Sequence, residues 1–263
     1  MAVNPERQPL WEQFYNCSNE LNEALRQRTP VLQSNFYIYH PLEYAGDIYR
    51  NFLEKYLNGP KRIWFVGMNP SRYGSLQTGI PFGDIPTVRD RMHLQGGVTN
   101  PPELHPNITI TGLDSLEEEE EVSSKRFWNL IKAIFNDEED FLDRFFQNCF
   151  IHNFCPLVFI DNNGHNISFE SLAERMPMEI KAMEEACLNA LQEQVELLRP
   201  EIIIPVGLYA FNMLQRLDYN KNGNCLLERI PHPSPKNFVY ESGWIKICKL
   251  ILMNSNIFDI IRS

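Results

Sequence analysis

The chain has 263 residues, of which 43% are hydrophobic and 12% are aromatic, enough apolar material for the core of one large domain. No apolar run approaches the roughly 18 residues that a membrane span needs, and the N-terminus lacks a basic-then-apolar signal sequence, so we expect an intracellular protein. The formal net charge of -10 argues against nonspecific coating of a polyanion, although a local basic face would still allow binding.

Charged residues and cysteines are distributed unevenly. The run of carboxylates from Glu117 to Glu121 favours a solvated loop. Basic residues that are compatible with phosphate contacts, or simply with scattered surface charge, gather around the glycine-rich segment described below: Lys61, Arg62, Arg72, Arg89 and Arg91. The six cysteines form no CxxC or CxxxC pair, so the sequence indicates neither a zinc site nor a disulfide framework, and we expect reduced, mainly buried thiols.

Two helices are predicted before the first strand. From Leu10 to Arg28 the apolar residues recur at the spacing of one helix face. A second helix is predicted from Glu43 to Leu57, followed by the stop signal Asn58-Gly59-Pro60. Arg62 to Val66 then has the composition of a buried strand that runs straight into Gly67. We interpret the chain as a single domain, residues 1–263, with an N-terminal helical extension over about residues 1–60.

The loop after this first strand is glycine-rich, within the sequence RIWFVGMNPSRYGSLQTGIPFGD from Arg62 to Asp84. It spans about seventeen residues, longer than most connections, and loops of that length are usually functional or disordered. Its apolar side chains argue for an ordered pocket wall: Met68, Tyr73, Ile80 and Phe82. Because ligands bind at the carboxyl ends of parallel strands in open α/β sheets, we expect the chemistry at this strand end.

Further helices and strands alternate along the rest of the chain, with a turn at Asn162-Asn163-Gly164. The predicted helices are Val88–Leu94, a helix capped by Ser123 or Ser124 that carries Phe127 to Phe135, Glu138–Phe146, Met178–Leu198, a helix opened by Gly207, and Trp244–Ile261. The predicted strands are Cys149–Asn153, Glu201–Val206 and Cys225–Ile230. Four strands alternating with helices predict a three-layer α/β/α sandwich with a central four-stranded parallel sheet.

Three of the predicted strands end in polar residues that can meet at one edge of the sheet: Asn69, Asn153 and His232. An Asn just past a strand is often only a turn former. His232 lies in the sequence PHPSP, where prolines on both sides restrict its backbone and so fix where the imidazole points. A structural histidine bonded to a backbone carbonyl is the alternative.

Four motifs, in matching order and spacing, resemble the uracil-DNA glycosylase superfamily, and within it the single-strand-selective monofunctional branch. They are GMNP and GSLQTGIPFGD within Gly67–Asp84, EVSSKRFW at Glu121–Trp128, HNFCPL at His152–Leu157, and HPSPKN with a later GW within His232–Trp244. The resemblance implies an α/β/α fold that uses no metal or other cofactor. It further implies removal of uracil, and of some 5-substituted uracils such as 5-hydroxymethyluracil, from single- and double-stranded DNA by a monomer. The implied location is the nucleus in a eukaryote and the cytoplasm otherwise.

The same resemblance implies roles for individual residues. Asn69 is similar to the residue that positions the attacking water, and Phe82 to the aromatic on which the flipped base stacks. Asn153 is similar to the amide that recognises the pyrimidine edge. His232 is similar to the histidine that, with the Met68 backbone N–H, stabilises the departing base. Cleavage leaves negative charge on uracil O2, so a fixed donor at that position lowers the barrier.

Two segments depart from the family pattern. Ser71-Arg72 stands where the family usually has Gly-Pro, which puts Ser71 beside the expected site of the pyrimidine 5-position. The segment from Lys236 to Ser242 resembles in position the wedge that enters the base stack, with KNFVYES in place of an RNPQAN-like sequence. Its candidate DNA-binding residues are Lys236, Asn237, Phe238 and Tyr240.

Two other classes of function stay open. An apolar residue in place of Asn69 or His232 would favour a noncatalytic DNA-lesion binding module on the same fold, and neither is apolar. A small-nucleotide hydrolase would need a phosphate-cradling glycine loop that enters a helix, or a carboxylate metal cluster, and the sequence has neither pattern. The sequence therefore favours a metal-free DNA glycosylase.

Overall fold

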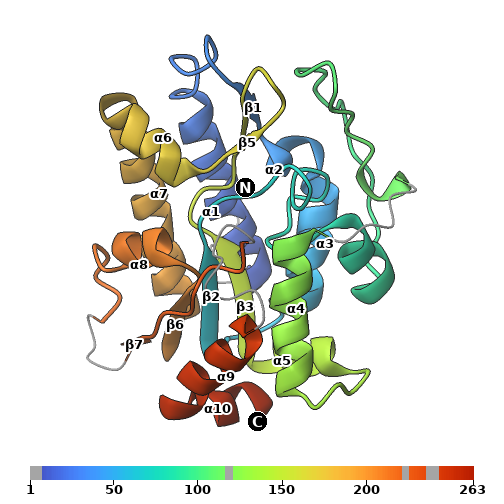
Figure 1. Ribbon diagram of the computed structural model, residues 1–263, viewed down its shortest axis with the longest axis vertical. Helices are drawn as coiled ribbons and strands as arrows, with labels where there is room; N and C mark the ends of the chain where they lie inside the picture. The colour runs from blue at the N-terminus through green and yellow to red at the C-terminus, as the bar shows by residue number, and fades with distance from the viewer. Residues whose placement is uncertain (1–7, 116–120, 221–224, 235–242) are drawn as a thin grey trace.

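Four parallel strands form the central sheet of the structure, a computed structural model that describes residues 8–115, 121–220, 225–234 and 243–263. Their order across the sheet is β3 (Cys149–Asn153), β2 (Ile63–Gly67), β6 (Ile202–Pro205) and β7 (Leu226–Leu227) (Figure 1). Every pairing is parallel, as predicted. The regular part of β7 is shorter than the predicted Cys225–Ile230, but the Ile230 N–H still donates to the Pro205 carbonyl.

Helices cover both faces of this sheet. They are α1 (Leu10–Arg26), α2 (Pro41–Tyr44), α3 (Gly46–Tyr56), α4 (Val122–Ile134), α5 (Phe141–Asn148), α6 (Phe169–Arg175), α7 (Pro177–Leu198), α8 (Leu208–Leu214), α9 (Trp244–Asn254) and α10 (Ile257–Arg262). In Figure 1, α1 lies behind the sheet and α4 in front of it. The predicted three-layer α/β/α sandwich is confirmed.

Alternating side chains of the strands explain the two layers, because successive residues of a strand point to opposite faces. Phe14 of α1 packs edge-to-face against Phe150 and His152, which lie two residues apart on β3. On the other face, Phe65 of β2 packs against Phe127 of α4. The helix α1 therefore covers the central sheet directly and also packs against α3 and α7.

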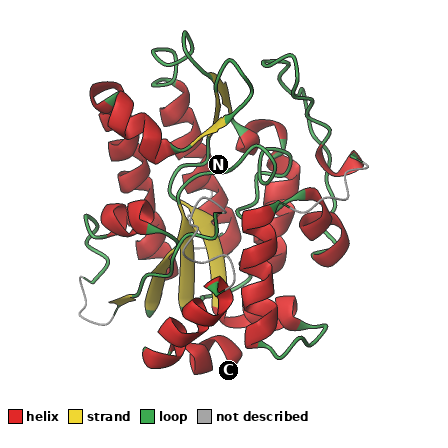
Figure 2. Cartoon of the chain, viewed as in Figure 1, coloured by secondary structure: helices red, strands yellow, loops and turns green. Residues whose placement is uncertain are grey.

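A second, smaller sheet lies beyond the upper end of the central strands and was not predicted (Figure 2). It is antiparallel, in the order β1 (Tyr37–Tyr39), β4 (Val158–Ile160) and β5 (Asn166–Ile167). Its strands of two or three residues are too short to show a hydrophobic period. The turn that joins β4 to β5 was predicted, because Asn162-Asn163-Gly164 has the composition of a tight turn.

Several helix boundaries differ from the prediction. The predicted Glu43–Leu57 is two helices, because Ala45 leaves the helical conformation between α2 and α3. The predicted terminal helix is interrupted at Asn256, whose φ of +57° lies in the left-handed region where helices end. The predicted Val88–Leu94 is only a π-helical turn, Thr87–Arg91. The helix α6 was not predicted.

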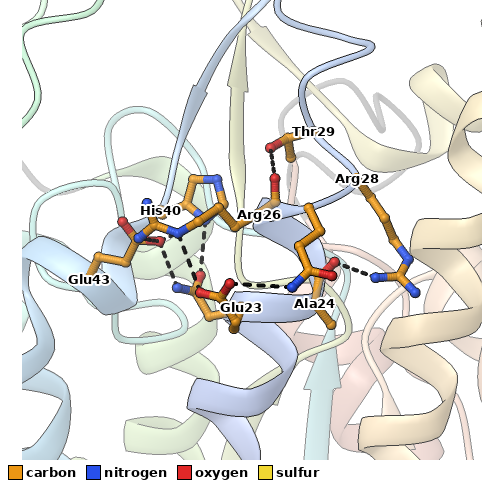
Figure 3. Close-up of polar contacts among 9 residues, drawn as sticks. Glu23, Ala24, Arg26, Arg28, Thr29, His40 and Glu43 are labelled. Carbon is orange, nitrogen blue, oxygen red and sulfur yellow. Dashed lines mark hydrogen bonds and ion pairs between the residues drawn. The ribbon is translucent and has the colours of Figure 1, made fainter.

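A polar network ties the end of α1 to the start of α2 (Figure 3). The Asn22 side-chain amide donates to Glu43 at 2.9 Å, and its carbonyl lies 3.1 Å from His40 Nδ1. Arg26 forms an ion pair with the same Glu43 carboxylate. Burial lowers the pKa of His40, although the neighbouring Glu43 carboxylate acts in the opposite direction. These contacts add a polar attachment to the apolar packing of α1.

Five of the cysteines are buried, Cys225 is half-buried and all six are free thiols, as predicted. In the described ranges, no helix combines the length and the apolar composition needed to cross a membrane.

Candidate active site

A pocket opens at the carboxyl ends of β2 and β3, where the sequence placed the chemistry. It is lined by Gly67, Met68, Asn69, Pro70, Ser71, Gly74, Ser75, Phe82, Glu121, Ser123, Asn153 and His232. The set includes every residue predicted to bind the base or to take part in catalysis. Segments separated by more than half of the chain therefore meet at one point.

Asn153 forms the part of the pocket that belongs to β3. It pairs in register with Gly67 of β2, and a Cβ atom at Gly67 would lie only 2.5 Å from Asn153 Oδ1. Glycine at this position therefore leaves the space that the Asn153 side chain occupies. Asn153 is buried, and within the described part of the chain its side-chain amide has no hydrogen-bond partner. A buried amide of this kind has donor and acceptor capacity for a ligand.

His232 contributes an imidazole whose tautomer is determined by its neighbour. The Ser234 backbone N–H donates to Nδ1 at 3.1 Å, so the proton of the neutral ring is on Nε2. Burial lowers the pKa of His232 to about 4, so the ring is neutral at pH 7. Gly207, at a φ of +102°, passes close to it, since an added Cβ would lie 3.1 Å from His232 Cβ. The Nδ1 atom thus accepts from a backbone N–H.

Asn69 is held by three backbone groups. Its Oδ1 accepts the N–H of Phe169, at the start of α6, at 3.1 Å. Its Nδ2 donates to the carbonyls of Pro70 at 3.0 Å and of Leu157 at 3.4 Å. The side chain therefore stabilises the local structure, as expected of a turn former, and it also fixes the position of an amide oxygen in the pocket wall. That oxygen has a second lone pair.

Phe82 forms the aromatic wall in a conformation that α4 imposes. Its φ of +51° is uncommon for a residue other than glycine and costs on the order of 1 to 3 kcal/mol. The Phe82 carbonyl accepts hydrogen bonds from Ser124 Oγ at 2.6 Å and from Trp128 Nε1 at 2.8 Å. Its ring stacks on Phe127 with centroids 4.2 Å apart and planes 7° from parallel. One ring face is covered by Phe127, so a base can stack only on the other.

Glu121 is a pocket residue that the sequence analysis missed. The expected cap of α4 was Ser123 or Ser124, but Glu121 is the cap, and its carboxylate accepts the Ser124 N–H at 2.7 Å. Its own N–H donates to Asp84 at 2.7 Å, which joins the glycine-rich loop to α4. Burial raises the pKa of Glu121. The acidic run suggested a solvated loop, and for Glu121 that prediction is wrong.

The predicted basic cluster is not one surface. Lys61 is buried and donates to the Phe146 carbonyl, and Arg62 pairs with Glu201 at 2.8 Å, both at the amino end of β2, opposite the pocket. Arg72 lies next to the pocket, but its guanidinium donates to backbone carbonyls of the protein. Arg89 pairs with Asp90. Neighbours in sequence at a strand start and a strand end are separated by the length of the strand. Lys61 and Arg62 therefore do not favour the phosphate-contact interpretation, and Arg62 fits the alternative of scattered surface charge.

The remaining predictions have mixed outcomes. Of the apolar residues expected to bury in the glycine-rich loop, Ile80 is fully buried, whereas Tyr73 is 65% exposed. The candidate wedge residues Lys236, Asn237, Phe238 and Tyr240 lie outside the described residues. Within the described ranges, no group of three or more His, Cys, Asp or Glu side chains is arranged to hold a metal ion.

Comparison with known protein families identifies the family of the chain that forms this pocket. The model of the uracil DNA glycosylase superfamily matches residues 54–250, a range that contains β2, β3 and every residue lining the pocket. The chain belongs to this superfamily. The uracil-DNA glycosylase resemblance predicted from the four motifs is thus confirmed.

Individual proteins that are similar to this chain have more specific names. A single-strand selective monofunctional uracil DNA glycosylase of Bos taurus is 32% identical over 263 residues, which is all of this chain and 93% of that protein. The proteins of the same name from Rattus norvegicus and Mus musculus are each 34% identical over 229 residues, 85% of this chain and 79% of theirs.

Among solved structures, a crystal structure of wild-type SMUG2 from Pedobacter heparinus matches with a TM-score of 0.58 and 20% sequence identity. The match covers 86% of this chain and 89% of that one, and it supports the fold of the superfamily.

Proposed function

We propose that this protein is a monofunctional DNA glycosylase that hydrolyses the N-glycosidic bond of uracil in DNA. Water adds to C1′ of the sugar and releases a proton, the bond from C1′ to uracil N1 breaks, and the uracil anion departs with the bonding electron pair and takes up a proton. The DNA strand keeps an abasic site. The observation that carries this proposal is the convergence of three groups on one pocket: the Asn153 amide, the Nε2–H of His232 and the ring of Phe82.

Recognition of uracil is assigned to Asn153. Its side-chain nitrogen donates to uracil O4 and its oxygen accepts from N3–H, which uses the amide that has no partner among the described residues. Cytosine has its donor and acceptor exchanged at these positions, so it would leave both groups of Asn153 unpaired. A site built on such polar pairing rejects the wrong base more strongly than a purely apolar pocket does.

Stabilisation of the leaving group is assigned to His232. A neutral imidazole with its proton on Nε2 donates to uracil O2, where negative charge develops, and the Met68 backbone N–H donates to the same atom. Because the tautomer is already selected by Ser234, no proton has to be rearranged during the reaction. The water is assigned to Asn69, whose Oδ1 is held at the wall of the pocket and orients it toward C1′.

The proposal extends to access and substrate range. A paired base cannot reach the pocket, so it must be extruded at a cost of a few kcal/mol, and single-stranded DNA avoids most of that cost. We therefore assign both single- and double-stranded uracil-containing DNA as substrates. From the family resemblance we further propose a monomer, located in the nucleus if the source is a eukaryote and in the cytoplasm otherwise. Ser71 places a hydroxyl in the pocket wall, and 5-substituted uracils such as 5-hydroxymethyluracil are included in the proposed range.

A direct assay tests the proposal. The protein is incubated with a uracil-containing oligonucleotide, with and without EDTA, and strand breaks are counted before and after alkali. We expect breaks only after alkali and no effect of EDTA. Absence of alkali-labile sites, loss of activity in EDTA, or a borohydride-trapped covalent adduct with DNA would contradict the proposal; tight binding without cleavage would favour a noncatalytic lesion-binding module instead.

A further inference from the structure

Two exposed apolar residues that the proposed chemistry does not use are sequence neighbours of residues lining the pocket. Tyr73 is 65% exposed and lies between Ser71 and Gly74, which both line the pocket. Val122 is 45% exposed and follows Glu121, another lining residue. The two segments are in contact, since a Cβ added at Gly74 would lie 3.9 Å from Glu121 Cγ. An exposed aromatic and an exposed aliphatic residue therefore belong to two segments that meet at the pocket.

Internal contacts hold the segment that carries Tyr73 in place. The Arg72 backbone N–H donates to Asn166 Oδ1 at 2.9 Å, and its guanidinium donates to the carbonyls of Gly164 and, at 3.2 Å, of Asn107. Gly164 has a φ of +82°, a left-handed conformation that favours glycine, and a Cβ there would lie 2.9 Å from the Arg72 guanidinium. The aromatic ring is thus attached to the β4–β5 turn through its neighbour.

Tyr73 also has a cationic neighbour. The Arg72 guanidinium lies over its ring, 5.2 Å from the centroid. Single exposed apolar residues are normal on protein surfaces and need no function. An ordered aromatic at the mouth of a pocket, with a cation on one side, has in addition the two features that bind a nucleic-acid strand without reading its sequence: a stacking surface and positive charge near the backbone.

We propose that Tyr73 stacks on the nucleobase next to the extruded uracil, with Val122 completing an apolar rim. The inference rests on the proposed function, because a uracil held in the pocket leaves its sugar at the mouth and its neighbouring nucleotide beside the rim. Every base has a π-face, so this contact tolerates any neighbour. In a single strand the neighbouring base is free to turn onto Tyr73, whereas in a duplex it is paired.

A double-mutant cycle between the ring and the neighbouring base tests the inference. The protein variants are Tyr73→Ala and Tyr73→Phe. The substrates are single-stranded oligonucleotides with one uracil flanked by ordinary nucleotides, or with an abasic analogue directly 5′ or directly 3′ of it. We expect Tyr73→Ala to lower kcat/KM on the ordinary strand by roughly 10-fold, the scale of one lost stacking contact. Tyr73→Phe keeps the ring and should stay near the parent.

The decisive result is non-additivity. On one of the two abasic-flanked strands, the parent should fall to the level of Tyr73→Ala, and Tyr73→Ala should lose nothing further. Met178→Ala, an exposed apolar change on α7 away from the pocket, should match the parent on every strand. Equal losses from Tyr73→Ala on all three strands would overturn the inference. If the parent releases no uracil from any strand, the proposed function fails first, so the two failures are distinguishable.

Discussion

Gly67 determines how close the Asn153 amide can come to the floor of the pocket. Substituting it therefore tests base recognition without removing any polar side chain. Gly67→Ala puts a Cβ 2.5 Å from Asn153 Oδ1, and the amide must move. Since a displacement of about 1 Å can cost about 10²-fold in rate, we expect single-turnover uracil release to fall by roughly that factor. Gly59→Ala is the matched control, because a Cβ there meets nothing within 4 Å. Equal rates for both variants would contradict the assignment of Asn153.

His232 supplies the donor to the leaving group in the proposed mechanism. His232→Leu should reduce the single-turnover rate by about 10² to 10³, the usual scale for one preorganised donor to a developing anion. Affinity for abasic DNA should change little, because this product lacks the uracil to which His232 would donate its hydrogen bond. A parental rate in this variant would remove His232 from the mechanism.

At the scale of elements, α4 holds the stacking surface, because Ser124 and Trp128 both donate to the carbonyl of Phe82 in its left-handed conformation. The double variant Ser124→Ala, Trp128→Phe removes both donors and keeps the aromatic packing. The two lost hydrogen bonds together cost about 2 kcal/mol, so Phe82 should relax and kcat should fall by up to about 30-fold on single- and double-stranded substrates alike. Lys125→Ala on the exposed side of α4 is the control. A fall in thermal stability with unchanged kcat would mean that Phe82 keeps its position without these bonds.

The elements also show what could be predicted from the sequence. Strands with continuous apolar runs, such as Cys149–Asn153, were predicted to the residue, and the three strand-end polar residues do meet at one pocket. The strands of the small sheet were missed because two or three residues carry no period. Glu121 was missed because composition placed it in an acidic loop, whereas its role depends on the backbone geometry of a helix start. Contacts of that kind are not visible in composition.

For the whole molecule, the completely buried His152 links stability to pH. It lies between Phe14 and Trp64, its two ring nitrogens have no hydrogen-bond partner among the described residues, and burial lowers its pKa to about 3. In the unfolded chain His152 takes up a proton near pH 6.5, whereas in the folded chain it stays neutral down to about pH 3. The folding free energy that is present above pH 6.5 is therefore lost progressively as the pH falls toward 3. His152→Phe should make the free energy of unfolding less dependent on pH, by about 1.4 kcal/mol per pH unit in this window.

Urea unfolding of parent and variant at several pH values provides the measurement. At neutral pH the variant should be at least as stable as the parent, because it removes unsatisfied buried polar atoms. Identical pH dependence in both proteins would contradict the account. The packing of Phe14 on His152 leads us to propose that α1, within the predicted N-terminal helical extension, is part of the single domain that contains the sheet.

The burial of His232, together with the hydrogen bond from the Ser234 N–H to its Nδ1, has a consequence for the pH range in which the protein works. A donor that is already neutral, with a pKa of about 4, gains and loses no proton in the ordinary range of cellular acidity. The single-turnover rate should therefore stay level from about pH 5 to about pH 9, without the descending limb that a titrating histidine gives near neutrality. A rate that falls with an apparent pKa near 6.5 would mean that the imidazole titrates freely. With a level profile, it is the unfolding of the chain, and not the chemistry of its pocket, that sets the acid limit of activity.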